Sequence, residues 1–212
     1  MAQITRAETI DELIERVGAK LDLTITSSSI PSREQTVVWL NDGALLLARL
    51  LPARRLGGLQ QEIPYEDVTD KIDIDGNDLL RIVSVKKYGI ECRVMDQREL
   101  SLVKTRLPLT HTTRTPACAV SGDEGSVTLE FFPESNGNVE VKGLKRPTAY
   151  EDSDSWEPDE WSMPVELELP IIDYAVIQGK IQDEEPEQAA LLMKNWAQLL
   201  GIESKVDALG VD

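Results

Sequence analysis

Apolar residues recur at intervals of three and four near both ends of the chain, and this is the spacing of one face of an α-helix. Residues 9–21 and 32–51 are the first two such segments, and each begins with a Ser or Thr followed three residues later by Glu or Gln, a capping box. The second segment is apolar on more than one face, so it has to be covered from two sides. The pattern predicts either a helix inside a core or a helix lying between subunits.

The C-terminal part of the chain repeats this arrangement. Residues 171–182 and 187–200 carry apolar residues at helical spacing, with an acidic turn between them and Gly201 at the end. A final strand is predicted just before them, over residues 165–169, with Pro170 as the first helical residue. The two ends of the chain therefore each predict an αα-hairpin.

Between the hairpins the pattern alternates, as in half-buried strands. Strands are predicted around residues 68–74, 79–88, 90–94, 117–120, 125–132 and 139–144, with one helix over residues 96–106 that Asp96 caps. Tyr88-Gly89 predicts a tight connection between two of the strands. Asn136-Gly137 predicts a hairpin joining the last two, because Asn-Gly favours a two-residue turn.

These elements predict an α+β protein, in which a helical bundle made from the N- and C-terminal αα-hairpins carries an inserted, antiparallel, β-rich region. The expected segments are the N-terminal hairpin, the β-rich insertion with an acidic loop at 148–163, the C-terminal hairpin and a tail: 1–56, 57–169, 170–201 and 202–212. No run of about 18 apolar residues occurs, and no basic segment precedes an apolar one at the N-terminus. We therefore expect neither a membrane protein nor a secreted one.

The net charge of −16 changes the range of functions. Nucleic-acid backbones attract positive surfaces, so free nucleic-acid binding is disfavoured. A negative surface can serve solubility alone, or it can let DNA slide past without sticking. An acidic inhibitor that mimics DNA is an alternative, although the middle of the chain interrupts any acidic row with basic residues: Lys86, Lys87, Arg93, Arg98, Lys104 and Arg106.

Candidate chemistry is sparse. Cys92 and Cys118 lie in apolar, strand-like runs without partners at metal-ligand spacing, and His111 lies alone in a Thr-rich loop. The acidic loop gathers carboxylates that a small hydrolase or a metal site would use (Asp152, Asp154, Glu157 and Asp159), but such chemistry needs a rigid scaffold. We expect no enzyme and no catalytic, cofactor or metal site. Trp156 and Trp161 in this loop instead indicate a contact surface.

The tail ends the chain with apolar residues spaced as a short sticky segment: Ile202, Val206, Leu209 and Val211. A frayed end and a tail that docks on a partner are both compatible with this pattern.

Three segments together resemble the adaptor proteins that connect head to tail in tailed bacteriophages. They are IDELIERV at 10–17, WLNDGALLLARLLP at 39–52, and the ending PIIDYAVIQGKIQDEEPEQAALLMKNWAQLLG at 170–201. The resemblance covers nearly the whole chain. The long acidic loop before Pro170 and the long β-rich middle depart from the family pattern. It implies a ring, twelve-fold in this family, that sits beneath the portal protein and extends the DNA channel toward the tail.

This resemblance assigns expected partners to the residues. The four tail residues would bind the portal, and contacts between subunits are expected at Val38, Trp39, Leu45, Trp156 and Trp161. The β-rich region would face tail or neck proteins, and DNA would pass through the lumen without specific binding. The expected location is the neck of the virion, assembled in the host cytoplasm. Another neck component, such as a tail terminator, is the alternative within the same class.

Overall fold

The protein, seen here in a computed structural model, is of the mixed α+β class. The structure describes residues 7, 9–75, 79–106, 114–123, 126–151 and 162–207. Two compact units divide the chain, and we call them the helical unit, residues 1–58 with 147–212, and the β unit, residues 59–146. No helix within the described ranges is long and apolar enough to cross a membrane.

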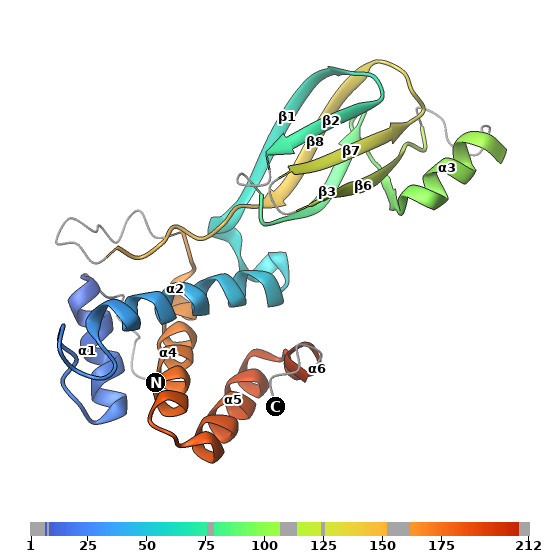
Figure 1. The fold of residues 1–212 in the computed structure, drawn as a ribbon. Coiled ribbons are helices and arrows are strands. Elements are labelled where there is room, and N and C mark those ends of the chain that lie inside the picture. Colours follow the sequence, from blue (N-terminus) through green and yellow to red (C-terminus); the bar gives the residue numbers. More distant parts are fainter. Residues whose placement is uncertain are drawn as a thin grey trace. The chain divides into compact units, whose positions relative to one another are not determined.

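The helical unit draws its helices from both ends of the chain. Its α-helices are α1 (Ile10–Leu21), α2 (Arg33–Leu50), α4 (Glu168–Gln182), α5 (Pro186–Leu200) and the short α6 (Glu203–Asp207). Short 3-10 turns are η1 (Ala53–Arg55), η2 (Gly57–Leu59), which reaches the unit boundary, and η4 (Val165–Leu167). In Figure 1, α4 lies between α1 and α5, and it contacts α1, α2 and α5.

The first two helices start where the capping boxes predict. The Thr9 side chain accepts the Glu12 N–H at 3.3 Å, and the Ser32 side chain accepts the Gln35 N–H at 3.3 Å. Each bond satisfies one of the N–H groups that a helix start leaves without a helical partner. The starts of α1 and α2 are therefore confirmed in their capping geometry.

α4 is the central helix of this unit. α2 packs closely against it at Gly43, where an added Cβ would lie 3.0 Å from Cδ1 of Tyr174. At its start, the fully buried carboxylate of Glu168 accepts the Ala7 N–H at 3.1 Å and a hydrogen bond from the Arg16 guanidinium. Residues from the N-terminal end of the chain are thus held directly on a helix from the C-terminal part.

The predicted strand at 165–169 is wrong. Residues 165–167 form η4, and α4 already begins at Glu168. Pro170 therefore falls in the first helical turn, where the backbone N–H groups have no helical carbonyl acceptor, so the missing N–H of proline costs no hydrogen bond. Leu167 is buried whereas Leu169 is exposed, so the alternation of three apolar residues did not define one sheet face.

The β unit contains two four-stranded sheets. One sheet has the order β1 (Gln60–Val68), β8 (Gly137–Leu144), β3 (Arg81–Lys87), β4 (Ile90–Glu91), and the other has the order β2 (Lys71–Asp75), β7 (Ser126–Phe132), β6 (Ala117–Asp123), β5 (Arg93–Met95). All pairs are antiparallel except β5 with β6. Apolar residues of both sheets form one core, which includes Val85, Leu129, Phe131 and Val141. Helix α3 (Gln97–Arg106) connects β5 toward β6, and Asp96 caps it as predicted.

The predicted hairpin between β7 and β8 is wrong, because the two strands belong to different sheets. The segment after Phe132 carries the chain from one sheet to the other. Gly137 lies against the ring of Tyr88, and an added Cβ would come within 2.2 Å of its Cε1. The glycine is needed for this close approach and not for a turn. The tight connection at Tyr88-Gly89 is confirmed: both residues have positive φ, 59° and 72°, and they join β3 to β4.

Candidate functional site: contact surfaces of the helical unit

The outer side of α5 exposes three leucines: Leu191, Leu192 and Leu199. The helix turns Ala189, Met193, Trp196, Ala197 and Leu200 inward. Trp196 also donates its indole N–H to the Pro170 carbonyl at 2.8 Å, which fixes the rotation of α5 beside the start of α4. The residues on the other side of the helix must therefore face away from α4.

We call this other side the leucine face: Gln188, Leu191, Leu192, Asn195, Gln198 and Leu199. Leu199 is 82% exposed and Leu191 is 61% exposed. No residue of the leucine face is charged, although the chain has 38 acidic and 22 basic residues. The charged side chains Glu187 and Lys194 lie at one edge of the face, as the helical angles require. Exposed leucines among neutral amides are typical of a helix surface that another protein covers.

A second exposed apolar surface lies where the beginning of α2 meets the end of α4. Val38 is 51% exposed and Ile181 is 50% exposed. Gln182 donates its side-chain N–H to the Gln35 side chain at 3.4 Å, which places these two apolar residues on joined helix segments. We call Gln35, Val38, Ile181 and Gln182 the α2–α4 patch.

Carboxylates border this patch on several sides. Glu34 precedes Gln35, Asp42 follows Val38 by one helical turn, and Asp183 follows Gln182, and all three are exposed. The Asp42 carboxylate also affects Tyr174 of α4, because burial and this nearby negative charge raise the pKa of the Tyr174 phenol. The patch is therefore apolar in its centre and negative at its rim.

The residues expected at subunit contacts fall into different environments. Val38 is exposed, as a contact requires, whereas Trp39 and Leu45 are half-buried within the helical unit. Trp156 and Trp161 lie outside the described residues. Much of the surface of α2 is covered within the chain itself, since α4 packs on it. Within the described part of the chain, Val38 is the most exposed large apolar residue of α2.

Two of the four expected portal-binding residues are covered by the chain itself. Ile202 is 2% exposed and Val206 is 6% exposed. Helix α6 is tied to the end of α2, because the Lys205 ammonium donates to the Leu50 carbonyl. The Arg55 guanidinium of η1 donates to the Leu200 carbonyl and holds the end of α5 nearby. Leu209 and Val211 lie outside the described residues.

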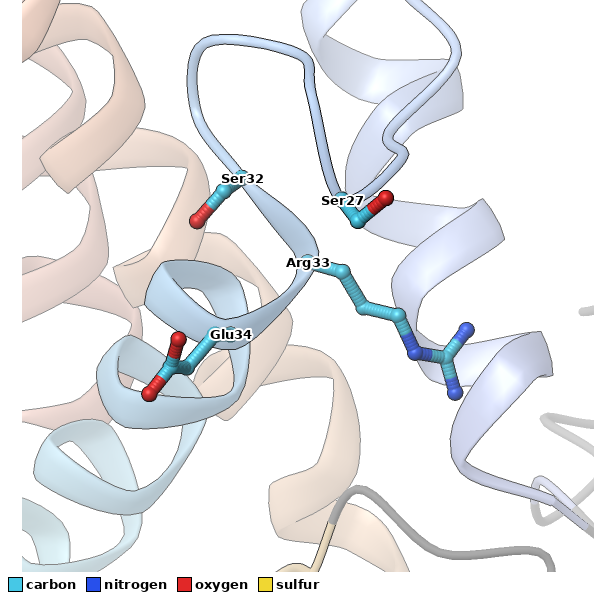
Figure 2. A pocket seen from close by; sticks show the side chains of 4 residues that line it. All are labelled: Ser27, Ser32, Arg33 and Glu34. Atoms are coloured by element: carbon cyan, nitrogen blue, oxygen red, sulfur yellow. The ribbon is translucent and has the colours of Figure 1, made fainter.

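The helical unit also contains a small pocket beside the start of α2. Its volume is about 380 Å³, and it is lined by Ser27, Ser32, Arg33 and Glu34 (Figure 2). Two serine hydroxyls and an arginine at a helix start could hold an anion. Here the Ser32 hydroxyl caps α2, and Arg33 makes an ion pair with Asp11. The polar groups of this pocket therefore serve the connection between α1 and α2.

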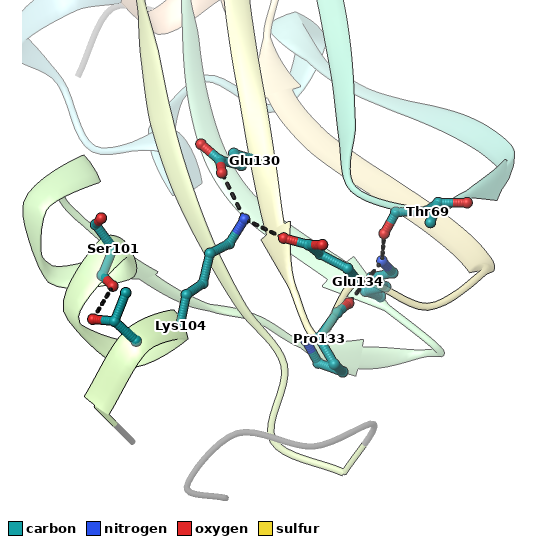
Figure 3. A network of polar contacts seen from close by, with 8 residues as sticks. Thr69, Ser101, Lys104, Glu130, Pro133 and Glu134 are labelled. Carbon is teal, nitrogen blue, oxygen red and sulfur yellow. Dashed lines mark hydrogen bonds and ion pairs between the residues drawn. The ribbon is translucent and has the colours of Figure 1, made fainter. Parts of the chain in front are cut away.

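Polar groups of the β unit are engaged in the same way. The Lys104 ammonium of α3 lies 2.6 Å from a carboxylate oxygen of Glu130 and 2.6 Å from one of Glu134 (Figure 3). Burial alone would lower the pKa of Lys104, but the two hydrogen-bonded carboxylates raise it above its ordinary value. This network fastens α3 to β7 and to the segment that follows it.

Lys87 is the other notable ammonium, because its side chain is fully buried. It donates to the Thr69 carbonyl at 2.7 Å and the Pro133 carbonyl at 3.3 Å, and it lies 5.1 Å from the centre of the Phe131 ring. Burial lowers the pKa of Lys87 below its ordinary value. Its partners are main-chain carbonyls of two connecting segments, so its role is to hold the sheets' connections.

The β unit also has an apolar cleft of about 430 Å³ that opens between its two sheets. Ile74 and Val120 line it from one sheet, and Ile82 and Val83 line it from the other. Cys92 and Cys118 are buried as the sequence predicts. Within the described part of the chain, no group of three His, Cys, Asp or Glu side chains could hold a metal ion.

Sequence reasoning missed three anchoring residues. Glu168 sits at the start of α4 and carries no motif. Lys87 lies at the end of a predicted strand and was counted only as charge. Asn41, within the WLND segment, donates to the Tyr150 carbonyl at 3.0 Å and accepts the Tyr150 N–H at 2.7 Å. No pattern in the sequence shows that this amide pairs with a main chain more than a hundred residues away.

The chain matches no protein-family model, and no curated protein matches it.

Proposed function

We propose that this protein is a structural subunit of a bacteriophage neck, an adaptor that assembles as a ring between the portal and the tail. The helical unit would be the ring body, in which the hairpins from both ends of the chain form one bundle. The β unit would extend toward tail or neck proteins. The protein would do its work by contact and would carry no reaction of its own.

The observation that carries this proposal is the uncharged, leucine-rich side of α5 on a chain of net charge −16. A protein that acts alone gains nothing from such a surface, because exposed leucines favour association. The polar groups that looked most like chemistry have other tasks: Arg33, Lys104 and Glu168 each bond to a residue of the same chain. These pairings support a role in contact with other proteins.

Charge gives the proposed ring a second property. Copies of a chain with net charge −16 would place many carboxylates around a shared channel. DNA phosphates are repelled by such a wall, so DNA can pass through it with little tendency to bind. This is what an extension of the DNA channel requires.

The apolar cleft between the two sheets supports a contact role for the β unit. Val83, Val94 and Val120 beside it are exposed, and a partner that covered them would gain apolar burial. A DNA mimic fits this unit less well. Its carboxylates alternate with ammonium groups in the pairs Lys86 with Glu140 and Lys142 with Glu62, so they form no continuous negative row.

The proposal is tested by mixing the purified protein with a portal ring from the genome that encodes this chain. Negative-stain electron microscopy should show an added collar on one end of the portal, and sedimentation should show a defined number of bound copies. A portal ring from an unrelated phage serves as the control and should stay bare. A chain that remains a monomer, both alone and in the presence of its portal, would rule the proposal out.

A further inference from the structure

The leucine face and the α2–α4 patch lie at different places on the helical unit. Leu199 is near the end of α5 that lies beside the start of α4, as the bond from Trp196 to Pro170 shows. Ile181 is at the opposite end of α4. Ile181 follows Pro170 by eleven positions, which is roughly 16 Å along a helix. The leucine face and the α2–α4 patch are therefore separate surfaces, not two parts of one.

The charges beside the two surfaces differ, because one edge carries both signs and the other rim carries carboxylates. Lys194 is exposed at the edge of the leucine face. Glu34, Asp42 and Asp183 are exposed at the rim of the α2–α4 patch, and none of them makes an ion pair within the described part of the chain. Glu187 lies at the same edge as Lys194, so this edge is neutral in sum, and its available ammonium can face the carboxylates around the other surface.

We infer that the leucine face of one copy binds the α2–α4 patch of the next copy, head to tail, with Lys194 directed to the carboxylates at the patch's rim. This inference deepens the proposed function, because a ring needs a contact between unlike surfaces of neighbouring copies. Contacts between unlike surfaces continue from copy to copy and close into a ring when the rotation allows it. Pairing of two leucine faces would instead stop at a dimer.

Charge also limits the surfaces through which a second copy can bind. Two chains of net charge −16 repel each other, so they approach most easily through surfaces that lack carboxylates or that place a cation against them. The leucine face has no charged residue, and its edge carries one of the chain's 22 basic residues. Both halves of the contact are thus present on one molecule.

The test uses two double variants of the full chain. Leu191→Glu with Leu199→Glu damages only the leucine face, and Val38→Glu with Ile181→Glu damages only the α2–α4 patch. All four positions are at least half exposed, so the fold should survive each change. Sedimentation equilibrium over a range of concentrations should show association of the wild type, weakened about 100-fold or more in each variant.

The decisive measurement is an equimolar mixture of the two variants. Head-to-tail binding leaves one intact surface on each, so the mixture should form dimers and nothing larger, with affinity within about tenfold of the wild type. This recovery also shows that both variants are folded. Glu166→Gln and Ala19→Glu, at exposed positions outside both surfaces, serve as controls for a lost and an added charge, and both should associate like the wild type.

Several results would overturn the inference. The inference fails if the wild type stays monomeric at every concentration, or if the leucine-face variant associates like the wild type. It also fails if the mixture stays monomeric, or if the patch variant dimerises on its own through paired leucine faces. The proposed function fails by a different result, the absence of a collar on the portal. A collar formed equally well by both variants would refute the head-to-tail contact and leave the adaptor role standing.

Discussion

The buried carboxylate of Glu168 offers a direct test of how the two ends of the chain hold the helical unit together. Replacement by Gln keeps the shape and one carbonyl oxygen but removes the negative charge. The fully buried carboxylate accepts the Ala7 N–H and a hydrogen bond from Arg16, which is 36% exposed. Because these contacts join residues about 150 to 160 positions apart, their loss should weaken the whole unit.

The magnitude follows from the two contacts. A hydrogen bond to a charged group contributes about 1.5–3 kcal/mol, and the exposed Arg16 contact lies at the low end of that range. The charge in the first turn of α4 adds about 0.5 kcal/mol through the helix dipole. Glutamine retains part of the Ala7 bond, so Glu168→Gln should lower the free energy of unfolding by about 2–3 kcal/mol and the melting temperature by about 5–10 °C.

The assay can report on this unit alone. All four tryptophans of the chain lie in the helical unit, so tryptophan fluorescence during urea unfolding follows it without a signal from the β unit. Glu166→Gln is the matched control, because Glu166 is exposed two residues away and should change stability by less than about 0.5 kcal/mol. If Glu168→Gln unfolded at the same urea concentration as that control, the charge of Glu168 would have no part in holding Ala7 and α1 to α4.

Three further predictions concern other anchoring points. Asn41→Ala should remove both hydrogen bonds to the Tyr150 main chain and lower the free energy of unfolding by about 1–3 kcal/mol. Proteolysis near Tyr150 should become faster in this variant, whereas Asp42→Ala should leave the cleavage rate unchanged. Gly137→Ala should destabilise the β unit by about 1–3 kcal/mol, because an added Cβ there meets the Tyr88 ring. Gly57→Ala is the control and should leave stability unchanged, because the space around Gly57 is open. Equal melting curves of the two variants in far-UV circular dichroism would contradict this prediction. Burial lowers the pKa of Lys87 in the folded protein, so the unfolded chain binds the Lys87 proton more tightly. The free energy of unfolding should therefore rise as the pH rises from the lowered folded pKa to the ordinary value of 10.5. Lys87→Met should remove this rise, which the difference between wild-type and variant urea midpoints across alkaline pH measures.

Local sequence signals predicted the helices well because their causes are local. Thr9 and Ser32 cap the helices within three residues, and Gly201 ends α5 in the left-handed conformation it tolerates at φ 68°. The turn at Tyr88-Gly89 is local in the same sense. Each of these features depends on a few neighbouring residues, so the sequence states it directly.

The errors arose where distant residues decide the structure. Asn136-Gly137 looks like a hairpin turn, but the place of Gly137 is set by the ring of Tyr88, nearly fifty residues earlier. Val68, Ile72 and Ile74 were assigned to one strand, yet Val68 ends β1 in one sheet and the other two lie in β2 of the other sheet. A period of two shows that a residue lies in a strand, and it does not show which sheet receives the strand.

The candidate contact surfaces show the same division between local and distant causes. Leu192 and Leu199 follow the helical spacing of α5 together with Trp196 and Leu200, and periodicity alone groups all four. The structure separates them, because the bond from Trp196 to the Pro170 carbonyl fixes which side of α5 faces α4. Once that side is fixed, Leu199 has to point outward. The surface on which the proposed assembly depends is therefore a consequence of one tertiary hydrogen bond and the packing around it. Trp196→Phe lacks the donor, so this variant should both loosen the packing of α5 and weaken the association between copies.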